Sequence, residues 1–210
     1  VERDAARETL ARIQGPGVRE ALVGEIDKSD APVKAELLRV LGERGEPGAV
    51  SVLLQNASAD AEPVRLAALE SLRKLAAEEA LSPLLELAGK QKPDADREPL
   101  LKALYAVCQA SRNKEHSARR VIDAINGAPA DRRRPLLTLL SALGTADALS
   151  TAQSAAQDQD IELAKEAVRV LADWPNAAPA PQLLDLARTS TDATLHALAR
   201  RGEIEPRIAE

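Results

Sequence analysis

The chain has 210 residues and is 45% hydrophobic but only 1% aromatic, with no Phe or Met and a single Trp, Tyr and Cys. One cysteine excludes an intrachain disulfide and leaves a zinc site without most of its usual ligands. The net charge of −5 argues against a dedicated nucleic-acid-binding protein, which usually carries a large basic surplus.

In chain order, the apolar pattern predicts a series of helical hairpins of about 30 residues each. In segment 62–75, for example, Val64, Ala68 and Leu72 follow one another at steps of four residues and share one helical face. A second apolar set at helical spacing begins at Leu81, after a short connection. Signals for β-strands are nearly absent, so the sequence predicts an all-α chain.

The hairpin recurs at a nearly constant period of about 31 residues, with extra residues near 91–97 where we expect a longer loop. The counterparts of the first-helix core position are Leu10, Leu41, Leu72, Cys108, Leu143 and Leu171. The counterparts of the second-helix core position are Leu22, Leu53, Leu84, Val121, Ala152 and Leu183. The predicted units of a single array are 1–30, 31–60, 61–95, 96–130, 131–159, 160–191 and a partial unit at 192–210.

Polar residues, prolines and glycines mark the ends of the units. An aspartate precedes each predicted first helix, where it can accept a hydrogen bond from an unpaired helix N–H. These aspartates are Asp30, Asp60, Asp96, Asp131, Asp160 and Asp192. Pro32, Pro63, Pro99 and Pro135 follow and suit the first helical turn. Gly42 and Gly45 suit a helix C-terminus.

The segment DAPVKAELLRVLG at Asp30–Gly42, repeated loosely from Asp60, resembles a HEAT repeat. The short period resembles the HEAT-like repeats of the phycobilisome-lyase type. Leu171–Gly202 resembles the closing repeats of HEAT arrays in large bacterial proteins of the Planctomycetes and Verrucomicrobia type. The resemblance covers nearly the whole chain. It implies a right-handed α-α superhelix, an armadillo-like HEAT solenoid of about six to seven hairpins.

We expect a fragment of a longer protein, because the chain starts at Val1 inside a predicted helix. In addition, charged residues follow Gly202 where another apolar helix is expected. No apolar run reaches the roughly 18–20 residues of a membrane span, and no signal peptide is visible, so we expect a soluble chain. The expected partner is another protein or a neighbouring domain of the same chain, with no membrane and no small-molecule substrate.

No catalytic, cofactor or metal motif stands out. His116 and His196 are about two and a half repeats apart, and the chain has no H-E-x-x-H pattern, so we predict no metal and no cofactor. Cys108 occupies a core position otherwise filled mainly by leucine and is interpreted as a buried thiol. A nucleophile paired with His116 is the alternative interpretation of Cys108.

Two features are candidates for partner binding. Segment 112–134 holds seven basic and three acidic residues. Its arginines form either a docking patch for an acidic surface or phosphate-bearing polymer, or a solvated face. Trp174 is either a packing plug between units or an exposed aromatic anchor. The candidate residues are Arg112, Arg119, Arg120, Arg132, Arg133, Arg134 and Trp174.

We therefore predict a non-enzymatic protein–protein interaction scaffold with a concave surface formed by the second helices. Solvent-facing residues expected on that surface are Gln55, Glu86, Arg119, Asp123, Gln157 and Asp185. One alternative is a nucleic-acid-binding HEAT-like protein of the DNA glycosylase type, which the shortage of aromatic stacking residues disfavours. The other is a bilin-lyase-type chaperone enzyme, which depends on fold analogy alone.

Overall fold

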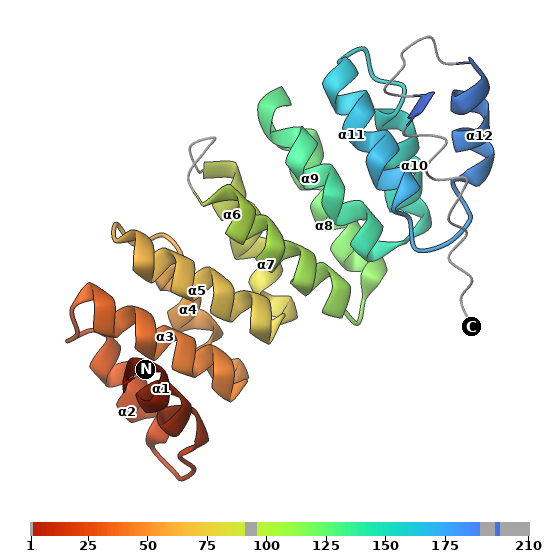
Figure 1. The fold of residues 1–210 in the computed structure, drawn as a ribbon. Coiled ribbons are helices and arrows are strands. Elements are labelled where there is room, and N and C mark those ends of the chain that lie inside the picture. The colour runs from red at the N-terminus through yellow and green to blue at the C-terminus, as the bar shows by residue number, and fades with distance from the viewer. Residues whose placement is uncertain (1, 91–95, 190–195, 198–210) are drawn as a thin grey trace. The chain divides into compact units, whose positions relative to one another are not determined.

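The computed structural model describes residues 2–90, 96–189, 196 and 197, and this part of the chain is all-α, without strands (Figure 1). The α-helices are α1 (Glu2–Arg12), α2 (Val18–Ile26), α3 (Ala31–Arg44), α4 (Val50–Asn56), α5 (Glu62–Leu75), α6 (Leu81–Lys90), α7 (Arg97–Ala110), α8 (Lys114–Gly127), α9 (Ala130–Leu143), α10 (Ala146–Ala155), α11 (Ile161–Ala172) and α12 (Ala180–Thr189). Odd-numbered helices are the first helices of the predicted hairpins, and even-numbered helices are the second.

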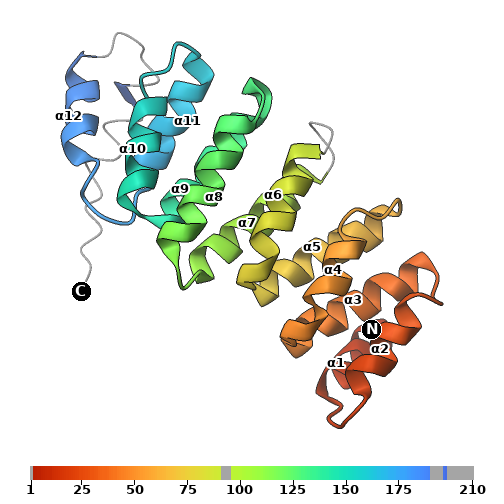
Figure 2. The same cartoon turned by 180° about the vertical axis from the view of Figure 1, so that it is seen from behind.

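The chain divides into two compact units, residues 1–110 with α1–α7 and residues 111–210 with α8–α12. In the first unit the odd helices α1, α3, α5 and α7 pack side by side in one layer. The even helices form a second layer, in which each packs against the first helix of the following hairpin: α2 on α3, α4 on α5 and α6 on α7 (Figures 1 and 2). Each hairpin therefore buries its apolar stripe against its neighbours.

The predicted core positions of the first unit are largely confirmed. Leu41, Leu72 and Cys108 are fully buried on the first helices, as are Leu53 and Leu84 on the second. Each buried leucine contributes about 2 kcal/mol through its removal from water. Leu10 is only half-buried, because α1 has a single first-helix neighbour among the described helices.

In the second unit, α9 and α11 pack side by side, while α8 packs on α9 and α10 lies against α8, α9 and α11. The core positions Leu143, Leu171, Val121 and Leu183 are buried. Ala152 is also fully buried, on the alanine-rich helix α10. Its small side chain allows α10 to approach three neighbouring helices closely.

Of the five predicted aspartate caps that lie among the described residues, two are formed. The Asp30 side chain accepts a hydrogen bond from the Val33 N–H (3.1 Å), and the Asp160 side chain accepts from the Glu162 and Leu163 N–H groups.

The prediction was wrong for three other aspartates. Asp60 precedes the cap residue Ala61, the Asp96 carboxylate pairs with Arg65, and Asp131 lies inside α9. Asp192 lies outside the described residues.

Pro135 also departs from its predicted place. Helix α9 begins at Ala130, so Pro135 falls in the second turn instead of the first. There it supplies no N–H to the Asp131 carbonyl. Pro32 and Pro63, in contrast, lie in the first turns of α3 and α5, as predicted.

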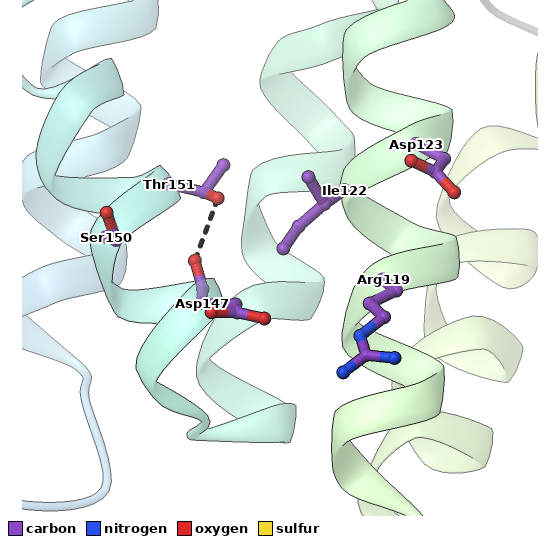
Figure 3. Close-up of a pocket in the computed structure, with 6 residues that line it drawn as sticks. All are labelled: Arg119, Ile122, Asp123, Asp147, Ser150 and Thr151. Carbon is purple, nitrogen blue, oxygen red and sulfur yellow. Dashed lines mark hydrogen bonds between the residues drawn. The ribbon is translucent and has the colours of Figure 1, made fainter.

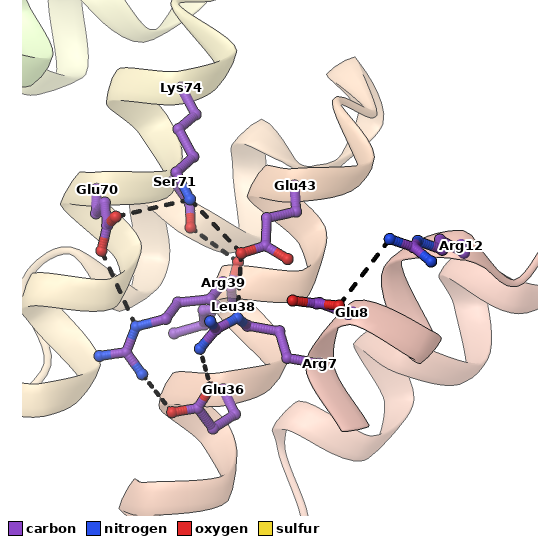
Figure 4. Close-up of polar contacts among 10 residues, drawn as sticks. All are labelled: Arg7, Glu8, Arg12, Glu36, Leu38, Arg39, Glu43, Glu70, Ser71 and Lys74. Carbon is purple, nitrogen blue, oxygen red and sulfur yellow. Dashed lines mark hydrogen bonds and ion pairs between the residues drawn. The ribbon is translucent and has the colours of Figure 1, made fainter. Parts of the chain in front are cut away.

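The two glycines near the end of α3 serve different purposes. Gly45 ends the helix in a left-handed conformation, with φ of 67°, as expected of a C-terminal glycine. Gly42 instead lies buried inside α3, against α5, where a Cβ atom would come within 2.6 Å of the Ser71 Cβ and Oγ. The Ser71 hydroxyl donates a hydrogen bond to the Leu38 carbonyl at 2.9 Å (Figure 4). Gly42 therefore sets the close approach of α3 and α5.

We predict that Gly42→Ala lowers the free energy of unfolding by about 1–3 kcal/mol, because the added methyl group overpacks the α3–α5 contact. The matched control is Gly24→Ala in α2, where a Cβ meets nothing within 4 Å. This control should instead raise stability by about 0.5–1 kcal/mol. Urea unfolding of both variants checks the prediction, and equal effects would contradict it.

Charged side chains link the first helices of the first unit on their exposed side (Figure 4). Arg7 of α1 pairs with Glu36 and Glu43 of α3, both at 3.1 Å. Lys74 of α5 continues the network to Glu43 at 3.7 Å and to Glu70 at 3.6 Å. Because several half-buried charges share partners, this network is worth more than isolated surface pairs.

Arg44, at the end of α3, joins two neighbouring hairpins of the first unit. Its Nη1 donates to the carbonyl oxygen of Leu10 (3.2 Å), in the last turn of α1, and to that of Ile13 (2.6 Å), just beyond the helix. The other side of the guanidinium pairs with Glu46. The Arg44 side chain is only 7% exposed. It thus supplies donors to carbonyl groups that have no partner within their own helix.

Replacing Arg44 by Met keeps an apolar stem but removes these donors. We expect a loss of about 2–3 kcal/mol in the free energy of unfolding, because the carbonyls of Leu10 and Ile13 lose a charged partner. Arg73→Met on α5 is the matched control, since Arg73 is exposed, and its effect should stay within about 0.5 kcal/mol. Chemical denaturation measures both values. An Arg44→Met variant of unchanged stability would show that the hydrogen bonds between the α1 and α3 hairpins are dispensable.

Candidate partner-binding site

In residues 111–210, the helices α8 and α10 are the second helices of consecutive hairpins. They carry polar side chains at the same sequence spacing. Helix α8 begins after Asn113, whose side chain accepts from the His116 N–H at 3.0 Å. Helix α10 begins after Thr145, whose hydroxyl accepts from the Ala148 N–H at 3.2 Å. On each helix, residues at positions i, i+3 and i+4 then lie on one face. These residues are Arg119, Ile122 and Asp123 on α8, and Asp147, Ser150 and Thr151 on α10.

The six residues line an open hollow of about 320 Å³ between α8 and α10 (Figure 3). Ile122 points toward α10, and the Arg119 guanidinium and the Asp147 carboxylate lie on facing walls. Asp123 lies at the edge and is directed away from Asp147. The hollow thus has an apolar centre and opposite charges on its two sides.

The charges of the hollow have no partners within the described part of the chain. No hydrogen bond or ion pair involves the side chains of Arg119, Asp123 or Asp147 there. The Thr151 hydroxyl donates to the backbone carbonyl of Asp147 at 2.9 Å and leaves its carboxylate available. The hollow therefore offers one cationic and one anionic group to a ligand.

Charges on the first helices of the same unit are arranged differently. Arg134 of α9 lies 3.8 Å from Glu162 of α11, which also pairs with Lys165 at 3.2 Å. Arg169 pairs with Glu166 at 2.8 Å. The first-helix layer therefore satisfies these charges internally, whereas the walls of the hollow do not.

The structure does not bring the six candidate arginines into one site. Arg112 is exposed ahead of α8, and Arg120 donates to His116 Nε2 at 3.2 Å. The side chains of Arg132, Arg133 and Arg134 belong to α9, in the other layer of the unit (Figures 1 and 2).

The two other α9 arginines also have neighbours of their own. Arg133 donates to the Ala128 carbonyl at 2.9 Å, and Arg132 lies 4.0 Å from Asp131. Only Arg119 lines the hollow, and the partner-binding roles of the others remain predictions.

Trp174 is not an exposed anchor, which corrects one of the two interpretations of this residue. The Trp174 residue is only 5% exposed, and its backbone N–H donates to the Leu171 carbonyl at 3.3 Å as α11 ends. The following Pro175 packs closely on the α9–α10 turn, where a Cβ on Gly144 would lie 3.1 Å from the Pro175 Cγ. The burial and the packing of this turn fit the interpretation as a structural plug.

Because Trp174 is the single tryptophan, its fluorescence reports on this region. We expect blue-shifted emission that is protected from iodide quenching, and a loss of about 3–5 kcal/mol in stability for Trp174→Ala. Tyr105→Ala, at a residue 37% exposed, is the control with a clearly smaller loss. Strong quenching together with a neutral Trp174→Ala would place the indole at the surface after all.

Sequence reasoning singled out Arg119 and Asp123 but missed Asp147, Ser150 and Thr151. One signal was available, because Ser150 stands 31 residues after Arg119 and so occupies the same position of the repeat. Short hydroxyl residues in an alanine-rich helix carry no pattern of their own, and only their place opposite α8 gives them a role.

Two further findings concern the described residues. No three His, Cys, Asp or Glu side chains in this part of the chain come together in an arrangement that would hold a metal ion. None of the helices described there combines the length and apolarity that crossing a membrane requires.

Comparison with known proteins identifies the fold. Residues 20–105 match the family of HEAT repeats, whereas no curated protein matches. A designed armadillo repeat protein in complex with the peptide (KR)4 is similar over 87% of this chain and 97% of its own, with 17% identity and a TM-score of 0.50. An engineered protein is similar over 88% of this chain and 56% of its own, with 19% identity and a TM-score of 0.50.

The complex of CpcE and CpcF of phycocyanin lyase from Nostoc sp. PCC7120 is similar over 91% of this chain and 76% of that chain. The identity is 18% and the TM-score 0.46. At these identities the likenesses concern the fold alone. The repeat family at residues 20–105 and the helical architecture agree. Residues 20–105 therefore match HEAT repeats, and the described part of the chain as a whole is an all-α helical repeat.

Proposed function

We propose that this chain is a non-enzymatic scaffold that binds another protein, or a neighbouring domain, through its second helices. The observation that supports this most directly is the hollow between α8 and α10, where Arg119 and Asp147 face each other and neither pairs with another described residue. A surface whose charged groups lack internal partners keeps its full hydrogen-bonding capacity for a ligand.

Taken separately, each of the two compact units exposes polar residues of its second helices. All six residues expected there are exposed, although Gln157 lies in the turn beyond α10 and Glu86 also pairs with Lys90 at 3.7 Å. By contrast, the charge network of Arg7, Glu43 and Lys74 is already satisfied within the first-helix layer of the first unit. The second-helix side is therefore the better candidate for a partner.

A protein of similar fold is known in complex with a peptide, the designed armadillo repeat protein with (KR)4. This likeness shows only that a related architecture holds a polypeptide ligand. The residues of this chain and not the likeness supply the argument for the α8–α10 surface. Polypeptide binding fits a surface of exposed polar side chains with one central apolar residue, Ile122.

Site-specific crosslinking tests the proposal. A photoreactive amino acid replaces Ser150, which is exposed on α10, or Arg169, which is exposed on α11 of the first-helix layer. In extract of the source cells, we expect the Ser150 variant to form one discrete protein adduct and the Arg169 variant to form none, because only the former lies beside the hollow. Mass spectrometry identifies the partner, and the purified partner must bind the unmodified chain.

Other results would overturn the proposal. Equal adducts from both positions would show that the second-helix surface has no special role. An adduct with nucleic acid would favour the nucleic-acid-binding alternative. Turnover of a bilin and an acceptor protein by the purified chain would favour the lyase alternative.

A further inference from the structure

We propose that the hollow between α8 and α10 binds the carboxamide side chain of a glutamine or asparagine from the partner. This inference rests on the proposed function, because it names the group of the partner that the same surface would recognise. It starts from the two charges on facing walls, Arg119 of α8 and Asp147 of α10.

The charges of the hollow favour a dipolar group over an ion. A cationic side chain would be attracted by Asp147 but repelled by Arg119, and an anionic side chain would meet the opposite arrangement. A carboxamide carries an N–H donor and a carbonyl acceptor on one planar group. It can donate to the Asp147 carboxylate and accept from the Arg119 guanidinium at the same time. Both bonds are then charge-assisted, which makes them stronger than bonds between neutral groups.

The rest of the hollow suits the stem of such a side chain. Ile122 points into it from α8, and Thr151 faces it from α10 (Figure 3). The Thr151 hydroxyl is engaged with the Asp147 carbonyl, so this residue contributes its methyl group more than a free donor. The methylene groups of a glutamine can pack on these two residues, while Ser150 offers a hydroxyl at the rim.

The position of Asp123 is compatible with a neutral ligand. This third charge lies at the edge and is directed away from Asp147. The central region between the walls therefore contains one positive and one negative group. An uncharged dipolar side chain balances both without leaving either charge buried and unpaired.

A displayed library of random twelve-residue peptides is the probe, with the full chain as bait. We expect the enriched peptides to share one Gln or Asn. Replacing that residue by Leu, Glu or Lys should weaken binding about tenfold or more, because Glu and Lys each leave one wall of the hollow without a partner and Leu leaves both. The affinities of individual synthetic peptides are measured by fluorescence anisotropy.

Variants of the chain test the two walls separately. Arg119→Gln and Asp147→Asn should each weaken binding of the selected peptide about tenfold. The double variant should lose much less than the product of the two single losses, because both side chains hold the same amide. Arg73→Gln and Asp27→Asn, at exposed positions outside the hollow, are matched controls that should bind normally. Circular dichroism confirms that every variant is folded.

Each other outcome overturns the inference. Enriched peptides that share a Lys, Arg, Glu or Asp would show that the hollow selects an ion. Peptides whose affinity is unchanged by the Arg119 and Asp147 variants would show binding elsewhere. A library without enrichment would reject carboxamide recognition. In each of these cases the crosslinking experiment still decides independently whether the second-helix surface binds a protein.

Discussion

Stacking of incomplete hairpins is the constraint on which the described structure depends. A single helical hairpin here exposes an apolar stripe that it cannot cover, and the next hairpin along the chain supplies the cover. Helix α4 shows this directly, because it packs on α5 of the following hairpin and its Leu53 is fully buried. Stability in such an array therefore arises at the junctions between hairpins, where Gly42 meets Ser71 and Arg44 binds the end of α1.

The near absence of aromatic residues follows from the same geometry. Two helix layers in close contact leave room for Leu, Val and Ala but little for large rings. Ala67 and Ala68 of α5 and Ala152 of α10 are fully buried where neighbouring helices come closest. The one tryptophan is buried where α11 ends, in the turn that leads to α12. The low aromatic content of the chain is thus a consequence of two closely packed helix layers.

Periodicity predicted the helices and the second-helix core because both depend on local spacing that the sequence displays directly. The details of the helix ends were less predictable. Asp60 and Asp131 stand where a cap was expected, yet α5 begins one residue later and α9 begins earlier, so neither side chain reaches an unpaired N–H. Helix ends shift by a residue or two at little cost, and the chain pattern does not resolve such shifts.

The candidate site was harder to predict than the helix ends, because it depends on which faces of α8 and α10 meet. The arginine-rich segment drew attention to charge density, but the arginines divide between two layers, and only Arg119 lines the hollow. Asp147 belongs to a different hairpin, and its relation to Arg119 depends on the rotation of both helices about their axes. Buried residues such as Val121 and Ala152 determine that rotation. The sequence pattern places these residues in the core, but it does not show which direction the neighbouring side chains face.

The packing that orients these helices also brings their charged faces to the same hollow. Val121 and Ala152 are fully buried and anchor α8 and α10 in the core, whereas Arg119 and Asp147 lie on the exposed faces of the same helices. Both remain hydrated in the open hollow, and their separation costs little while no ligand is present. A ligand that spans the gap then finds two oppositely charged groups already positioned, and less of its binding energy is lost in ordering them. The core thus fixes the helix backbones from which the two charges project.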